Sequence, residues 1–295
     1  MFNEDSRVKI PAILHLCRLG YTYIPKSKQD RLEENNIFPD IFKRSISKIN
    51  PQISEEEIQR LLTDVSLKLN YDDLGREFFR SLVNSSGTKL IDFENFNNNE
   101  FHVTTELTCK KGDEEFRPDI TVLINGMPLV FIEVKKPNNR EGVIAERNRI
   151  NKRFALKDFR AFTNVTQLML FSNNMEYEDG VIEPIMGAYY ATPSKDGVMF
   201  NYFREEELLN YTNLLKPENE ELENLVLKDN NIVAIKYTDE FKLNKNYETP
   251  INRIITSLLS KERLAFFLQF GITYVERTNR EGKIVIEKHI MRYPQ

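Results

Sequence analysis

Three ionisable residues interrupt an otherwise apolar part of this 295-residue chain. Asp119 precedes the apolar run 120–124, whereas Glu133 and Lys135 lie at the end of the apolar run 129–134. Two carboxylates and a lysine in one place describe a divalent-metal site for phosphodiester hydrolysis. The carboxylates suit Mg2+, and the lysine orients water or offsets negative charge. The alternative is an exposed hairpin end with a surface ion pair worth about 0–1 kcal/mol. The apolar surroundings favour the metal site, because charges seldom lie in buried strands without a partner.

Two strands and a turn must position these side chains. The alternating apolar residues on one face of each predicted strand are Ile120, Val122 and Ile124, and then Val130, Ile132 and Val134. Asn125-Gly126 supplies the turn, since both residues tolerate positive φ. A strict two-residue loop would place Asp119 and Glu133 on opposite faces of the sheet. An odd-length loop or a β-bulge would bring them together and would also align the two apolar faces. We therefore predict an odd loop or a bulge.

The same residues resemble a known nuclease signature. Pro118-Asp119 followed by Glu133-Val134-Lys135 is similar to the PD-(D/E)-x-K motif, and residues 116–136 resemble its version in the restriction (R) subunit of type I restriction-modification enzymes. Further similar segments, at residues 19–23, 171–174 and 291–295, spread the resemblance along the chain.

The resemblance implies a fold and a set of roles. The implied fold is α/β, a mixed β-sheet flanked by helices with a PD-(D/E)-x-K core and a C-terminal helical and hairpin extension. Asp119, Glu133 and the backbone carbonyl of Val134 would hold Mg2+, and Lys135 would position water or stabilise charge. In many nucleases of this fold an early helix adds an acidic ligand, for which Glu4 is the first candidate and Asp5 and Glu77 are others.

The implied function is that of the endonuclease module of a type I site-specific deoxyribonuclease. It would cut double-stranded DNA by Mg2+-dependent hydrolysis without sequence specificity of its own, while separate methylation and specificity subunits recognise the sequence. ATP would act only in a motor domain, and the chain contains no Gly-x4-Gly-Lys-[Ser/Thr] phosphate loop, so we expect a fragment that lacks the motor. The alternatives are a free-standing repair or recombination nuclease of the same fold, or a catalytically silent DNA-binding or assembly module.

A basic segment follows the predicted site. Residues 135–160 contain nine Lys or Arg against three acidic residues, in a chain whose net charge is −4. A helix is predicted over 143–154. The residues predicted to contact DNA phosphates are Lys136, Arg140, Arg147, Arg149, Lys152 and Arg153. A solvated helix face is the other interpretation. R subunits commonly carry a Gln and a Tyr four residues apart here, and this chain has neither between Lys136 and Thr166.

Composition limits the remaining classes of function. Apolar residues make up 40% and charged residues 29% of the chain, which is typical of ordinary folded domains. No apolar run approaches the roughly 20 residues that span a bilayer, and no signal peptide begins the chain, so we expect a cytoplasmic protein with no membrane contact. Cys17 and Cys109 belong to no metal-binding spacing and are expected to be reduced. His15 is expected to be packed inside a helix, although it could approach DNA.

The remaining pattern predicts three regions. Residues 1–215 form the nuclease domain, residues 216–250 a polar linker or peripheral segment, and residues 251–295 a helix and a β-hairpin that lead toward the absent motor. Predicted helices cover 3–19, 55–69, 72–84 and 251–270. Predicted strands cover 21–24, 89–93, 101–109, 166–172, parts of 177–191, 272–276 and 283–289. Residues 26–50 show no clear period.

Overall fold

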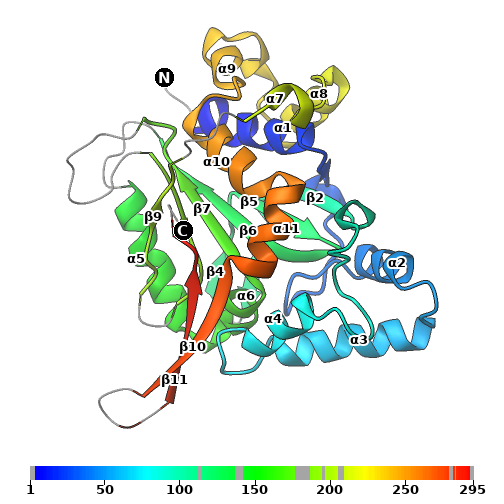
Figure 1. The fold of residues 1–295 in the computed structure, drawn as a ribbon. Coiled ribbons are helices and arrows are strands. Elements are labelled where there is room, and N and C mark those ends of the chain that lie inside the picture. Colours follow the sequence, from blue (N-terminus) through cyan, green and yellow to red (C-terminus); the bar gives the residue numbers. More distant parts are fainter. Residues whose placement is uncertain are drawn as a thin grey trace.

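The computed structural model describes residues 4–111, 114–136, 142–176, 187–194, 197–204, 209–278, 282 and 284–292. These residues form a mixed seven-stranded sheet flanked by helices (Figure 1), which confirms the predicted α/β fold. The strands, in spatial order, are β1 (Thr22–Tyr23), β2 (Phe101–Thr105), β5 (Ile120–Ile124), β6 (Met127–Val134), β7 (Leu168–Ser172), β8 (Ala188–Ala191) and β9 (Asn201–Tyr202). The β1–β2 and β6–β7 pairs are parallel, and the other neighbours are antiparallel.

The described part of the chain also contains two separate hairpins, eleven α-helices, and short 3-10 and π-helical turns. The hairpins are β3 (Cys109–Lys111) with β4 (Glu114–Phe116), and β10 (Ile272–Thr278) with β11 (Ile284–Ile290). The helices are α1 (Ile10–Arg18), α2 (Pro39–Ile49), α3 (Glu55–Lys68), α4 (Arg76–Val83), α5 (Gly142–Ala155), α6 (Arg160–Val165), α7 (Tyr211–Leu214), α8 (Glu220–Asp229), α9 (Asp239–Asn244), α10 (Pro250–Leu259) and α11 (Lys261–Phe270). No helix in this described part is long and apolar enough to cross a membrane.

The central strand β6 is buried on both faces by different helices. Phe131 packs in one cluster with Ile150 and Phe154 of α5. Val130 and Ile132 point the other way and belong to the large core that α1 and α10 share. Since successive side chains of a strand alternate between faces, Glu133 points to the same side as Phe131, toward α5. The end of β6 therefore directs its charged residues toward that helix.

Several predicted elements are confirmed. The helix predicted over 55–69 is α3, and its capping box is complete because Ser54 and Glu57 each accept the other's backbone N–H. The helix predicted over 143–154 is α5, and the strand predicted over 166–172 contains β7. The terminal hairpin is β10 and β11. Of residues 177–191, only β8 and Gly187 lie within the described residues.

One prediction about residues 26–93 is wrong, and one stretch without a predicted element contains a helix. Residues 89–93 are not a strand, because asparagine side chains instead of a neighbouring strand bond their backbone: Asn125 Nδ2 donates to the Leu90 carbonyl, and Asn99 Oδ1 accepts the Asp92 N–H. Residues 26–50, which show no clear period, contain helix α2. It begins at Pro39, which suits the first turn of a helix.

Two helix boundaries also differ from the prediction. The helix predicted over 72–84 begins only at Arg76, because Gly75 is left-handed (φ 78°) and the Asp73 carboxylate accepts the N–H of Gly75 and of Glu77. The single helix predicted over 251–270 is two helices, α10 and α11, because Ser260 between them has extended backbone (φ −61°, ψ 142°).

Residues 216–250, predicted as a polar linker or peripheral segment, fold into helices at the periphery beside α1 (Figure 1). Val226, Leu227 and Phe241 of this segment are nevertheless fully buried in the main core. The segment is thus attached to the domain by apolar packing, and its polar composition describes only its outer surface.

Candidate active site

A tight turn with a bulge sets the register of the β5–β6 hairpin. Asn125 (φ 50°) and Gly126 (φ 77°) form the two-residue loop, and Ile124 pairs with Met127. The register then shifts, so that Val122 lies opposite Val130 and Ile120 opposite Ile132. Leu129 is the extra residue. The predicted bulge is therefore confirmed, and it places the residues before β5 opposite the end of β6 on one face.

The carboxylate of Asp119 is held by the backbone. Its Oδ2 accepts the N–H of Val134 at 2.8 Å, and its own carbonyl accepts the N–H of Glu106 at 3.2 Å. Within a strand the N–H and C=O of one residue point to the same side. The carbonyl of Val134 therefore faces the side on which Asp119 lies.

Glu133 and Lys135 lie beside Asp119, as the hairpin predicts. Glu133 is only 4% exposed, and its Oε2 is 3.4 Å from Lys135 Nζ. Its other oxygen, Oε1, is buried without a hydrogen-bond partner among the described residues. Burial, and then the charge of Asp119, raise the pKa of Glu133 well above its ordinary value. Burial and the neighbouring charge of Asp119 therefore both oppose ionisation of this carboxylate.

Helix α5 contributes a residue that the sequence did not reveal. Glu146 is 2% exposed and its Oε2 lies 3.4 Å from Lys135 Nζ. Burial disfavours the lysine cation, but Glu133 and Glu146 outweigh burial and raise the pKa of Lys135. Lys135 is therefore fixed as a cation between two buried carboxylates. The only sequence signal was an acidic residue on the buried face of a basic helix.

Glu4 also approaches this site. Burial, and then the charge of Asp119, raise the pKa of Glu4, while Lys135 opposes them, so all three groups interact. Glu4 lies at the start of a helix that runs to Arg18 through a π-helical turn (Asp5–Lys9). Pro11 cannot donate to the Arg7 carbonyl four residues earlier, and Asn174 Nδ2 donates to that carbonyl instead, at 3.1 Å. The helix is thus irregular before Pro11.

Other predicted candidates lie elsewhere or have structural partners. Glu77 forms an ion pair with Arg80 at 2.6 Å on the surface of α4. Asp5 lies 3.8 Å from Lys9 Nζ. His15 is buried with Nε2 2.6 Å from Thr256 Oγ1, the packed state predicted for it.

The predicted DNA-contacting residues divide into two groups. Arg149 and Arg153 each lie 3.2 Å from a carboxylate oxygen of Glu146, and Arg153 also stacks on the ring of Phe116 at 3.9 Å. Arg153 thus has mainly a structural role, because both contacts hold its side chain in place, whereas the Arg149 side chain remains 56% exposed. Lys136 and Lys152 are exposed and Arg147 is half-buried. Arg140 lies outside the described residues.

A divalent cation fits the chemistry of this donor set. Asp119 and Glu133 would be the carboxylate ligands. No group of three or more His, Cys, Asp or Glu in the described ranges is arranged to hold a metal ion, so Glu4 is not positioned with them as a third ligand. Mg2+ suits such a site, because it is bound by one or two carboxylates and keeps several waters. The unpartnered Glu133 Oε1 supports the fit, since an ion would satisfy it.

Comparisons with known proteins gave a family match and several similar proteins. The family described as type I restriction enzyme R protein N terminus (HSDR_N) matches residues 1–178. A Methanocaldococcus jannaschii protein with the provisional name type I restriction enzyme MjaIXP endonuclease subunit is 28% identical over 60% of this chain and 19% of its own length. The HindI endonuclease subunit of Haemophilus influenzae is 23% identical over 50% of this chain and 15% of its own. The SauMSSORF170P endonuclease subunit of Staphylococcus aureus is 30% identical over 52% of this chain and 15% of its own length. The chain thus spans a fifth or less of the length of these relatives.

Proposed function

Because the chain belongs to the family of type I restriction enzyme R protein N termini, we propose that it is the endonuclease module of such an enzyme. Its reaction is the Mg2+-dependent hydrolysis of phosphodiester bonds in double-stranded DNA. In this reaction the oxygen of water bonds to phosphorus, one P–O ester bond breaks, and the leaving oxygen takes up a proton. The methylation and specificity subunits of the complex select the sequence, and the module itself has no sequence preference.

The acidic residues at the site have different roles in binding the ion. Asp119 and Glu133 are its ligands, with the carbonyl of Val134 completing the protein's share, and Glu4 is an additional acidic group at the site. The hydrogen bond from Val134 N–H fixes the orientation of Asp119, so that the ligand is preorganised. When bound, the ion supplies Lewis-acid stabilisation of the charge on the phosphoryl group.

Lys135 acts as a permanent cation in this proposal. Its raised pKa argues against a role as a general base, which requires the neutral amine. The ammonium group stabilises charge that develops on the phosphate oxygens. Glu146 keeps it in place from the α5 side when Glu133 is engaged by the ion. As a cation, Lys135 can also donate a hydrogen bond that positions the attacking water, the other role proposed for it.

The DNA contacts beside the site come from cations that are exposed or, for Arg147, half-buried. Lys136, Arg147, Arg149 and Lys152 reach solvent next to the end of β6 and along α5. They contact backbone phosphates, which carry no sequence information. Arg140 belongs to the same proposal from its place in the sequence.

The observation that carries the proposal is the buried Glu133 Oε1, which has no partner beside a second carboxylate and a lysine. The test is cleavage of supercoiled plasmid by the 295-residue protein in Mg2+ or EDTA. Asp119→Asn and Lys135→Ala are expected to reduce the rate at least 100-fold, whereas Lys228→Ala, an exposed residue on α8, is the matched control. Equal cleavage by wild type and both site variants, or cleavage that persists in EDTA, would refute the mechanism. Absence of cleavage with intact DNA binding would favour the silent-module alternative.

A further inference from the structure

Two lysines, Lys216 and Lys261, converge on Gly20 at the end of α1 remote from Glu4, and Arg18 and Lys48 lie in the same region. They come from four segments: Arg18 ends α1, Lys48 lies in the last turn of α2, Lys216 precedes α8, and Lys261 begins α11. We call these four residues the Gly20 cation cluster. Within the described residues none of them has a carboxylate oxygen within 4.0 Å, whereas the lysines at 9, 26 and 245 each pair with a glutamate. The cluster is thus a concentration of positive charge in an acidic chain.

The two ammonium groups at the centre of the cluster converge. A Cβ on Gly20 would lie 3.5 Å from Lys261 Nζ and 3.8 Å from Lys216 Nζ. Gly20 has φ +102°, a conformation that other residues rarely adopt. The chain therefore has no side chain at the point where both lysines arrive, which leaves room for a small group over the backbone.

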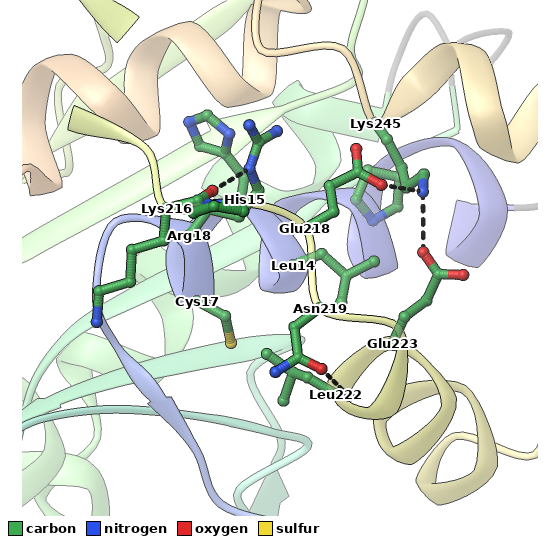
Figure 2. A pocket seen from close by; sticks show the side chains of 12 residues that line it. Leu14, His15, Cys17, Arg18, Lys216, Glu218, Asn219, Leu222, Glu223 and Lys245 are labelled. Atoms are coloured by element: carbon green, nitrogen blue, oxygen red, sulfur yellow. Dashed lines mark hydrogen bonds and ion pairs between the residues drawn. The ribbon is translucent and has the colours of Figure 1, made fainter. Parts of the chain in front are cut away.

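The backbone fixes one side of the cluster. Lys216 N donates to the Arg18 carbonyl at 2.8 Å, and Arg18 Nε donates to the Lys216 carbonyl at 3.0 Å. Figure 2 shows Lys216 extending along the chain that follows α1, away from the adjoining cavity of about 240 Å³. On the far side of that cavity Glu218 and Glu223 both bind Lys245, at 2.8 and 2.9 Å, so neither is directed to the cluster.

The charges of the cluster repel one another. Burial, and then the charges of Lys216 and Lys48, lower the pKa of Lys261. The favourable contact of its ammonium group is with the ring of Phe101, whose centroid is 4.7 Å away. An anion between the lysines would relieve this repulsion and replace the missing carboxylate.

We infer that the Gly20 cation cluster is a binding site for a phosphate group. A phosphate carries one or two negative charges on several oxygens, which matches two converging ammonium groups with the charge of a further lysine nearby. The phosphate belongs either to a DNA backbone or to a free polyphosphate. The site lies about 21 Å from Glu4, the length of 14 helical residues at 1.5 Å each, so it is separate from the candidate active site. Only the DNA source rests on the proposed function.

The test compares the variant Lys216→Gln/Lys261→Gln with the control Lys228→Gln/Lys242→Gln, which removes the same charge from exposed positions on α8 and α9. One arm measures binding of a 20-base-pair duplex in EDTA between 50 and 200 mM KCl. The loss of this one phosphate contact lowers the slope of log K against log salt by about 0.9, so over this fourfold change in salt the affinity of wild type is expected to fall about 3.5-fold more than that of the variant. The other arm measures thermal stabilisation by millimolar pyrophosphate.

The outcomes of the two arms identify the source or overturn the inference. A reduced salt slope in the cluster variant, but not in the control, supports the site with a DNA backbone as ligand. Stabilisation by pyrophosphate that the cluster variant loses and the control keeps supports a free polyphosphate, even if wild type binds no DNA. If the cluster variant behaves like the control in both arms, the inference is wrong. Because both arms omit Mg2+, they are independent of whether the protein cleaves DNA.

Discussion

Replacing Glu133 with glutamine is expected to stabilise the metal-free protein. The carboxylate is buried with one unpartnered oxygen beside the charge of Asp119. An unsatisfied buried polar group costs about 1–3 kcal/mol, and more if charged. Glutamine removes the charge at nearly constant volume, while Lys135 keeps Glu146 as a partner. The free energy of unfolding in EDTA at neutral pH is therefore expected to rise by about 1–3 kcal/mol, which corresponds to about 3–9 °C in Tm.

The pH dependence follows from the direction of the pKa shift. The folded-state pKa of Glu133 is raised, so the folded protein holds this proton more tightly than the unfolded chain. The wild type therefore loses stability as the pH rises from the ordinary value of 4.5 through the folded pKa. The variant has no such loss. Its advantage is expected to be largest at neutral pH and to vanish below the unfolded pKa, where the wild-type carboxyl is also neutral.

Metal ions should reverse the comparison. For a site with a Kd of about 1 mM, 10 mM Mg2+ stabilises the folded protein by about 1.4 kcal/mol. Wild type is expected to gain this amount and Glu133→Gln to gain none. The assay is urea or thermal unfolding, in EDTA and in Mg2+ at several pH values, with the exposed Glu34→Gln as a control that should change stability by less than 0.5 kcal/mol. If Glu133→Gln is less stable than wild type in EDTA, the carboxylate serves as the structural partner of Lys135 and the reasoning fails.

Three further predictions concern the support of the site. Glu146→Gln leaves three cations without their shared buried carboxylate, so the protein should lose about 3–5 kcal/mol of stability in urea unfolding, and cleavage should fall more than DNA affinity. No loss of stability would mean that Glu146 is not buried among cations. Burial alone would raise the pKa of Glu106, but hydrogen bonds from Lys9 and Lys26 outweigh burial and lower this pKa to about 2. Glu106→Gln should therefore lose up to about 3 kcal/mol of unfolding free energy at neutral pH and nothing near pH 2. A pH-independent difference in unfolding free energy would contradict this. In Gly126→Ala the new Cβ would lie 2.7 Å from the Phe38 carbonyl oxygen at a positive φ, so Tm should fall by several degrees. An unchanged Tm would contradict the close packing of Gly126 against the Phe38 carbonyl in this turn.

Local patterns predicted the parts of the fold that depend on local physics. The alternating residues of β5 and β6, with Asn125-Gly126 between them, require a bulge if both apolar faces and the charges are to align, and the structure has it. The Ser54 capping box likewise marked the start of α3. Both patterns lie within a few neighbouring residues, so they predict the local structure without knowledge of distant contacts.

Distant contacts explain what the sequence did not predict. The buried residues of α2, such as Phe42 and Ile46, pack against core residues that are distant in the sequence. The backbone of residues 89–93 is held by asparagine side chains from elsewhere in the chain. Glu146 is one of the three acidic residues in the basic segment 135–160, and its role depends on the end of β6, which packs beside it in space. The convergence of lysines on Gly20 depends in the same way on three-dimensional proximity.

The most direct test of the central claim is anomalous diffraction from crystals of the protein soaked in Mn2+. We expect a peak within ligand distance of the carboxylates of Asp119 and Glu133 on the side of the Val134 carbonyl, and no peak there in Asp119→Asn crystals. Full occupancy of Mn2+ at other positions, with none between Asp119 and Glu133, would contradict the proposal that these residues form a metal-dependent nuclease site.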